Sequence, residues 1–258
     1  MLKLDVTTKT PNDVVFSTSC VKNLEQDKLF GSFEAKYELS STGIMLIEKF
    51  NTDRALLAEI SCRDRLLTGL KLSLAEMMTP ITNDRKTLIK GELKRERFSM
   101  NVDFEYGDKG PQLTASLVLA YKGILGGVQT KFDVNRSEVG DLSFAAGYSN
   151  ADFILHTIVK NGTDYGGSIF HKVTENLDAG IDVVWFTDKE ETAFGIAGQY
   201  QLNEFTSIRG KLNNANELGL GYQQVLREGI TLTLSSLFDI TNAAEGKHKI
   251  GLGLQLEA

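Results

Sequence analysis

The stretch Gly229–Ala258 ends the chain with GITLTLSSLFD, a polar turn and then HKIGLGLQLEA. In its last segment a large aliphatic row, Ile250, Leu252, Leu254 and Leu256, alternates with a small or polar row, Lys249, Gly251, Gly253, Gln255 and Glu257. Because successive side chains of a β-strand point to opposite faces, this alternation predicts a strand with one aliphatic and one polar face. A soluble strand would bury the aliphatic row in a core, whereas a membrane strand would expose it to lipid.

Alternating segments of this kind recur along the whole chain. The clearest internal one is Phe98–Tyr106, in which five large apolar side chains alternate with small or acidic ones. Such runs return about every 10 to 14 residues without a break in composition, which is typical of a sandwich or a barrel. Runs of about 10 residues exceed the usual soluble strand of about 5 to 6 and match the 9 to 11 of a tilted membrane strand. We therefore predict an all-β fold in a single domain over residues 1–258.

Charged side chains in the middle of the predicted strands help to choose between the two architectures. Asp103, Lys131 and Arg209, for example, lie on polar faces far from any turn. Packed inside a dry core they would be costly unless paired, whereas in a water-filled interior they cost little. A wide, water-filled barrel is thus favoured. The alternative is a soluble β-sheet carrier with its polar face outward, which needs a partner layer to cover its apolar face.

Composition narrows the function classes. The formal net charge of -6 argues against nucleic acid as the main partner. No run approaches the roughly 18 to 20 apolar residues of a spanning helix, and early charges such as Lys3 and Asp5 predict no signal peptide. Cys20, Cys62 and the scattered histidines lack metal spacing. No nucleophile–base pair or paired acid site is evident, so we expect no enzyme, no metal and no cofactor.

One long segment, YQLNEFTSIRGKLNNANELGLGY at Tyr200–Tyr222, resembles the signature region of the eukaryotic mitochondrial porins, the voltage-dependent anion channels. The likeness runs through both closing strands and includes KLDVTTKT, GIMLIEKFNTD, FAAGYSNADFILHT and NGTDYGGSIFHKV in collinear order. The resemblance implies a nineteen-stranded transmembrane β-barrel in the mitochondrial outer membrane. An odd number of strands requires the first and last to pair in parallel, so Met1–Thr10 is expected to pair with His248–Ala258.

The resemblance also implies a function, diffusion of ions and small hydrophilic metabolites such as ATP, ADP and phosphate. Outer-membrane lipids would surround the barrel, and the channel could form homo-oligomers. An alternative is a docking platform for cytosolic kinases such as hexokinase and for apoptosis regulators, with conduction secondary. Members of the family begin with a further segment that includes an amphipathic helix in the pore. Met1 aligns with their first strand, so a wider pore and weakened voltage gating are expected, and the acidic charge predicts reduced anion selectivity.

Lining charges set the selectivity of a pore. The expected pore-lining charges are Lys3, Asp5, Lys9, Lys49, Asp103, Glu105, Lys131, Asp133, Arg209, Lys211 and Lys249. Glu48 differs from these because it lies on the aliphatic side of the run Gly43–Phe50. It matches the family's membrane-facing glutamate, which is implicated in gating, in lipid and calcium response and in kinase docking, and intramembrane ionisable residues are functional candidates. A hydrated surface carboxylate without a role is the alternative.

Two segments correspond to places where the family binds a dinucleotide weakly inside the pore. They are Glu217, Leu218 and Gly219, and Ser235, Ser236, Leu237, Phe238 and Asp239. The family usually has an apolar residue at the position of Glu217, and a carboxylate there should repel phosphates, so a role for Glu217 is disfavoured and the second segment stays open. Gly69-Leu70-Lys71 resembles a motif once proposed to contact nucleotide, but an ordinary strand start explains it better.

Overall fold

The computed structural model describes residues 1–24, 27–39, 42–80, 84–108, 110–241 and 248–257, and most of these residues are in β-strands. The strands are β1 (Leu2–Lys9), β2 (Val14–Asn23), β3 (Lys28–Leu39), β4 (Ile44–Asn51), β5 (Leu56–Arg63), β6 (Leu70–Thr79), β7 (Asp84–Lys94), β8 (Phe98–Tyr106), β9 (Gln112–Tyr121), β10 (Ile124–Asp133), β11 (Glu138–Ser149), β12 (Phe153–Lys160), β13 (Asp164–Thr174), β14 (Leu177–Phe186), β15 (Glu191–Asn203), β16 (Thr206–Asn213), β17 (Glu217–Arg227), β18 (Ile230–Asp239) and β19 (Lys249–Glu257). A short 3-10 turn, Thr187–Lys189, joins β14 to β15. Within the described ranges, no helix has the length and apolar character needed to cross a membrane.

The strands form one nineteen-stranded sheet in which β1 pairs with both β2 and β19. Neighbours in sequence pair antiparallel wherever a register is defined, for example β17 with β18 and β5 with β6. Since the last strand pairs with the first, the series of pairings has no free edge, which is the topology of a β-barrel. The predicted fold class and strand number are thereby confirmed.

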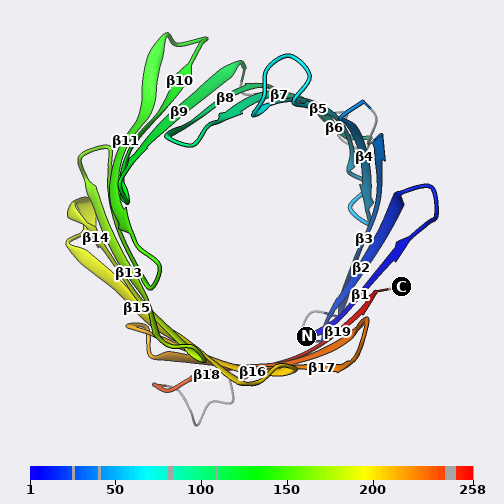
Figure 1. The fold of residues 1–258 in the computed structure, drawn as a ribbon, viewed down its shortest axis with the longest axis vertical. Coiled ribbons are helices and arrows are strands. Elements are labelled where there is room, and N and C mark those ends of the chain that lie inside the picture. Colours follow the sequence, from blue (N-terminus) through cyan, green and yellow to red (C-terminus); the bar gives the residue numbers. More distant parts are fainter. Residues whose placement is uncertain (25–26, 40–41, 81–83, 109, 242–247, 258) are drawn as a thin grey trace. The chain divides into compact units, whose positions relative to one another are not determined.

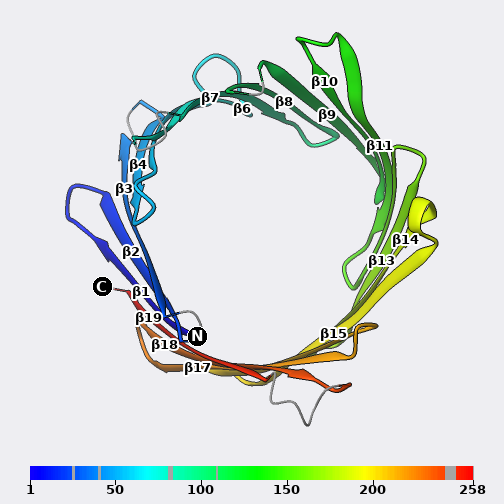
Figure 2. The same ribbon diagram turned by 180° about the vertical axis from the view of Figure 1, so that it is seen from behind.

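The pairing of β1 with β19 is parallel. The Met1 amine donates a hydrogen bond to the Ile250 carbonyl oxygen at 2.7 Å, and the Leu252 N–H donates one to the Met1 carbonyl oxygen at 3.0 Å. One residue bonded to positions two apart on its neighbour is the parallel pattern, and it places Met1 opposite Gly251. The expected parallel pairing is confirmed, although Ala258 lies outside the described residues. Figures 1 and 2 show the chain start beside β19 from both sides.

Contacts divide the chain into two compact units: unit 1 comprises Met1–Val6, Cys20–Leu29 and Ala146–Ala258, and unit 2 comprises Thr7–Ser19 and Phe30–Ala145. The single-domain assignment stays a prediction. In unit 1, cross-strand partners share a face, so the row that contains Leu252, Leu234 and Tyr222 defines its apolar face. The neighbouring positions in each strand form its polar face.

Unit 2 follows the same rule. Across β7, β8 and β9, one apolar row contains Leu93, Met100 and Leu117, and the alternate positions of β8 are Ser99, Asn101, Asp103 and Glu105. Side chains therefore alternate between an apolar face and a polar face in both units, as the sequence predicts. The hairpin between β12 and β13 turns at Asn161 and Gly162, which both have positive φ, 55° and 72°, as the Asn-Gly pair favours.

The described residues contain almost no hydrophobic core. Ala75, at 6% exposure, is their one buried apolar residue, whereas Leu252 is 43% exposed and Ile250 is 72% exposed. A folded soluble protein of this size would bury a large close-packed apolar interior. The apolar faces are instead uncovered, and no layer of described residues packs on them. The soluble carrier therefore lacks the partner layer it requires.

Candidate functional site on the polar face of unit 1

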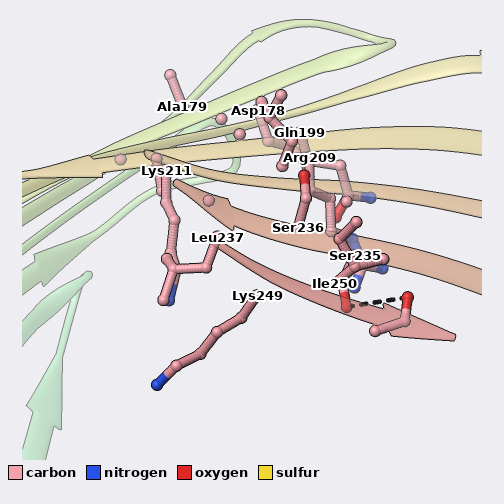
Figure 3. Close-up of a pocket in the computed structure, with 18 of the residues that line it drawn as sticks. Asp178, Ala179, Gln199, Arg209, Lys211, Ser235, Ser236, Leu237, Lys249 and Ile250 are labelled. Carbon is pink, nitrogen blue, oxygen red and sulfur yellow. Dashed lines mark hydrogen bonds between the residues drawn. The ribbon is translucent and has the colours of Figure 1, made fainter. Parts of the chain in front are cut away.

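The polar face of unit 1 carries a cavity of about 700 Å³ over β13 to β19 (Figure 3). We call it the basic cavity, because its lining includes the cations Arg209, Lys211 and Lys249. Figure 3 shows Lys211, Leu237 and Lys249 pointing to the same side of the sheet. Asp178 is the acidic residue among those that line it, and it lies directly opposite Lys172 of β13.

The strand registers explain why the cavity is there. One row across four strands reads Lys211, Gly219, Leu237 and Lys249. The next reads Arg209, Gly221, Ser235 and Gly251. Glycine in a strand leaves space where a side chain would stand, so Gly219, Gly221 and Gly251 leave open space between the cationic side chains. The distance between neighbouring strands, about 4.8 Å, brings side chains of four strands within reach of one small solute.

A second cavity of about 340 Å³ adjoins the first and shares Ala197 and Lys211 with it. We call it the acidic cavity, because Asp182 and Glu217 line it. Glu217 is held in place by Asn213, whose side-chain Nδ2 donates to Glu217 Oε2 at 2.9 Å. The Glu217 N–H donates in return to Asn213 Oδ1 at 3.0 Å. In β18, Asp239 lies directly opposite Glu217.

The segments expected to contact a nucleotide are divided between the two faces. Glu217, Gly219, Ser235, Leu237 and Asp239 lie on the polar face. Leu218, Ser236 and Phe238 lie on the apolar face, because Leu218 pairs with Phe238 and Ser236 pairs with Ile250. Among the polar-face members, Gly219, Ser235 and Leu237 line the basic cavity, while Glu217 lines the acidic one.

The expected pore-lining charges all occupy polar-face positions, and several form ion pairs. Lys3 Nζ lies 2.8 Å from Asp5 Oδ2, and Lys49 Nζ lies 3.7 Å from Glu34 Oε2. Lys9 pairs with Asp13 at 2.9 Å. In unit 2, Glu105 Oε1 accepts from Lys86 Nζ at 2.7 Å.

The remaining expected charges take these positions. Asp103 lies opposite Lys90 in β7, and Lys131 lies opposite Thr114 and Asp133 opposite Gln112 in β9. Arg209, Lys211 and Lys249 converge on the basic cavity.

Glu48 lies on the apolar face of unit 2, as the alternation predicts. Its direct neighbours are Ala35 in β3 and Ala58 in β5, and it is exposed. The sequence reading missed a second carboxylate in this row. Glu76 of β6 lies opposite Ala58 and is also exposed on the apolar face. The signal was available, since Leu70, Leu72, Leu74, Glu76 and Met78 form one alternating set.

Among the residues that the structure describes, no group of three or more His, Cys, Asp or Glu side chains could hold a metal ion. Cys20 and Cys62 are free thiols. His171 lies on the apolar face of β13 with its ring against Phe153, at 6.2 Å between ring centroids.

Comparison with known proteins agrees with this architecture. Residues 1–251 match the family model described as eukaryotic porin. The "Voltage-dependent anion-selective channel" of Drosophila melanogaster is 44% identical over 256 residues, which is 99% of this chain and 91% of that protein. The human "Non-selective voltage-gated ion channel VDAC1" is 40% identical over 258 residues, 100% of this chain and 91% of that protein.

Solved structures support the fold alone. A variant of the Rh. blastica porin aligns with a TM-score of 0.53 at 9% sequence identity, covering 94% of this chain and 89% of that one. Together with the match of nearly the whole sequence to one family, the strand number and the parallel pairing lead to one assignment. The chain belongs to the eukaryotic porin family, whose members are channel proteins and not enzymes.

Proposed function

We propose that this protein forms an aqueous channel in the mitochondrial outer membrane, through which ions and small hydrophilic metabolites such as ATP, ADP and phosphate diffuse. One observation carries the proposal. The apolar face is uncovered along the described strands, while the opposite face carries unpaired and paired charges of both signs. An uncovered apolar face is stable against lipid, and a charged face is stable against water, so a barrel that spans a membrane around an aqueous interior accounts for both faces. The relatives named above, which are channels by name, support the same function.

The selectivity of the channel follows from the charges on its polar face. Arg209, Lys211 and Lys249 favour anions over β16 to β19, whereas Asp182 and Glu217 oppose them one row away. Ion pairs such as Lys86–Glu105 cancel part of the remaining field. With a formal net charge of -6, anion preference is expected to be weak. Reversal potentials across a KCl gradient measure it directly, and strong anion selectivity would contradict this expectation.

Weak nucleotide binding belongs to the same face. The phosphates of ATP or of a dinucleotide would lie against Lys211 and Lys249, near Gly219 and Ser235, where glycines leave room. Glu217 would repel them, so binding is expected on the basic cavity side only. Lys211→Gln should weaken ATP binding, and Glu217→Gln should strengthen it. Equal ATP affinity in both variants would argue against this placement.

Glu48 is proposed as the membrane-facing site for gating, lipid response and docking of partners such as hexokinase, apoptosis regulators or a second copy of the chain. Its support is geometric, since it is a carboxylate on the apolar face with alanines on both sides. Small neighbours let another molecule approach the carboxylate closely. Unchanged lipid and partner binding by Glu48→Gln would remove the support for this site.

The experiment that tests the proposed function is single-channel recording of the refolded protein in a planar bilayer. Stepwise conductance in KCl is the expected result. A protein that carbonate extracts from membranes without detergent, and that never conducts, would overturn the proposal. A variant that binds partners and conducts nothing would favour the docking role.

A further inference from the structure

Six charged side chains on the polar face of unit 1 line the two adjoining cavities. Asp178, Arg209, Lys211 and Lys249 line the basic cavity, and Asp182 and Glu217 line the acidic cavity. Among the described residues none of the six takes part in an ion pair, whereas Lys3, Lys49 and Lys86 of the same kind of face pair within 2.7 to 3.7 Å. Neighbouring charges of opposite sign that stay unpaired are available to a ligand that carries both.

Local packing explains why these charges do not neutralise one another. The Lys211 stem lies across Gly219, where an added Cβ would come within 2.7 Å of Lys211 Cε. Since Gly219 is on β17, this directs Lys211 away from Asp182, which is on β14. The Asp182 carboxylate in turn occupies the space beside Gly195, where an added Cβ would lie 2.8 Å from its Oδ1. Two glycines thus make room for two charged side chains that lean in the same direction across the strands, so that Lys211 extends away from the Asp182 carboxylate.

The Glu217 carboxylate is held by the Asn213 side-chain amide, which donates to Oε2, and the Glu217 backbone N–H in turn orients that amide by donating to its Oδ1. Only its Oε2 is used by the Asn213 amide, so Oε1 can accept from a ligand. Lys211 and Asn213 are two positions apart in β16, and strands rise about 3.3 to 3.4 Å per residue, so the cationic and acidic rows are about 7 Å apart.

We propose that the two adjoining cavities form a binding site for small zwitterionic solutes. The ammonium group of the solute lies against Asp182 and Glu217, and its carboxylate or phosphate lies against Lys211, with Arg209 and Lys249 behind it. A simple anion is attracted by one cavity and repelled by the other, and a simple cation meets the reverse. Only a dipolar solute satisfies both rows. The site rests on the proposed function in one respect, which is that water and solutes reach this face.

The probe is 6-aminohexanoate, whose charges are separated by a chain of five methylene groups. Hexanoate and hexylammonium are the matched single-charge controls. Binding to the refolded, isotopically labelled protein in micelles is followed by NMR shifts of the Gly195, Gly219 and Gly221 amides. Because an exposed ion pair contributes about 0.2 to 1 kcal/mol, we expect 6-aminohexanoate to bind up to about fivefold more tightly than either control.

Two sets of variants separate the contributions of the rows. Asp182→Asn with Glu217→Gln should reduce 6-aminohexanoate affinity to that of hexanoate, while hexanoate binds better than to the unmodified protein. Lys211→Gln should instead leave 6-aminohexanoate no better than hexylammonium. Lys131→Gln, on the polar face of β10, is the control and should change none of these affinities.

Equal affinity of the unmodified protein for 6-aminohexanoate and hexanoate would overturn the inference, as would unchanged affinity after Asp182→Asn with Glu217→Gln. Conductance of each variant in KCl shows that it is folded and open. A protein that conducts but does not discriminate refutes only the zwitterion site. One that does not conduct refutes the proposed channel instead.

Discussion

An arginine placed on the apolar face should destabilise the protein far more than one placed a single residue away. Leu234 is the fifth of ten residues in β18, lies between Tyr222 and Leu252, and is 42% exposed. If that face meets lipid, Leu234→Arg puts a guanidinium near the middle of the hydrocarbon layer. The expected cost is about 2 to 4 kcal/mol, which lowers the folding equilibrium constant by about 30- to 900-fold.

Thr233→Arg is the matched control, because Thr233 lies on the opposite face between Gln223 and Gly253. With polar or small neighbours and water on that side, the arginine should cost no more than about 0.5 kcal/mol. The two variants share the same strand, the same depth and the same added charge. Only the face differs.

Urea unfolding from lipid vesicles measures both free energies, with the fluorescence of Trp185, the single tryptophan, as the signal. Trp185 lies beside Tyr165, at 5.6 Å between ring centroids, on the apolar face of β14, so its emission should respond to loss of the fold. Equal costs for the two variants, or a larger cost for Thr233→Arg, would refute the assignment of the lipid face. The assignment would also be refuted if both variants inserted into the vesicles, conducted like the unmodified protein and unfolded at the same urea midpoint.

Three further predictions follow from single contacts. Continuing the parallel register places Lys3 opposite Gly253. The double variant Lys3→Cys with Gly253→Cys, made in a background without the native thiols, should therefore form a disulfide on mild oxidation. A gel shift detects the disulfide, and its absence would argue against the parallel pairing of β1 with β19. Gly69→Ala should reduce the free energy of unfolding by at least about 1 kcal/mol, seen as a lower urea midpoint, because Gly69 has φ +81° and an added Cβ would collide with a carbonyl oxygen. Gly126→Ala is the control, and it should leave the midpoint nearly unchanged because the space around Gly126 is open. Glu76→Gln should raise the unfolding midpoint in vesicles, because it removes a charge from the apolar face; a lower midpoint would show that the carboxylate has a stabilising partner there.

The strands that the sequence reading identified are those with clean alternation. The alternation alone does not identify β3, β5 and β7, which lie between strands with a clearer pattern. In β7, Lys86, Lys90 and Lys94 belong to the polar face, but Arg85 and Thr87 interrupt the apolar row, so the period-two pattern is weak. Hydrogen bonding to β6 and β8 makes β7 a strand despite its weak pattern. The sequence of β7 alone does not show this, because the partners lie in other segments.

The candidate sites divide in the same way. The alternation within β4 is enough to show that Glu48 lies on the apolar face. That Glu48 lies opposite Ala58, and that Glu76 lies opposite Ala58 on its other side, depends on the registers of β4 with β5 and of β5 with β6. Likewise, the nucleotide segments look continuous in sequence, yet Leu218 and Phe238 face away from Gly219 and Leu237.

By itself, then, the sequence determined which residues share a face, because side chains alternate along any extended strand whatever lies next to it. It also indicated the family through motifs spread along the chain. Only the tertiary structure decided which charges meet across strands, because register depends on hydrogen bonds and packing between segments far apart in sequence. Lys211, Gly219, Leu237 and Lys249 form one row for that reason. Lys211 therefore lies over a glycine, and within the described part of the chain neither Asp182 nor Glu217 forms an ion pair.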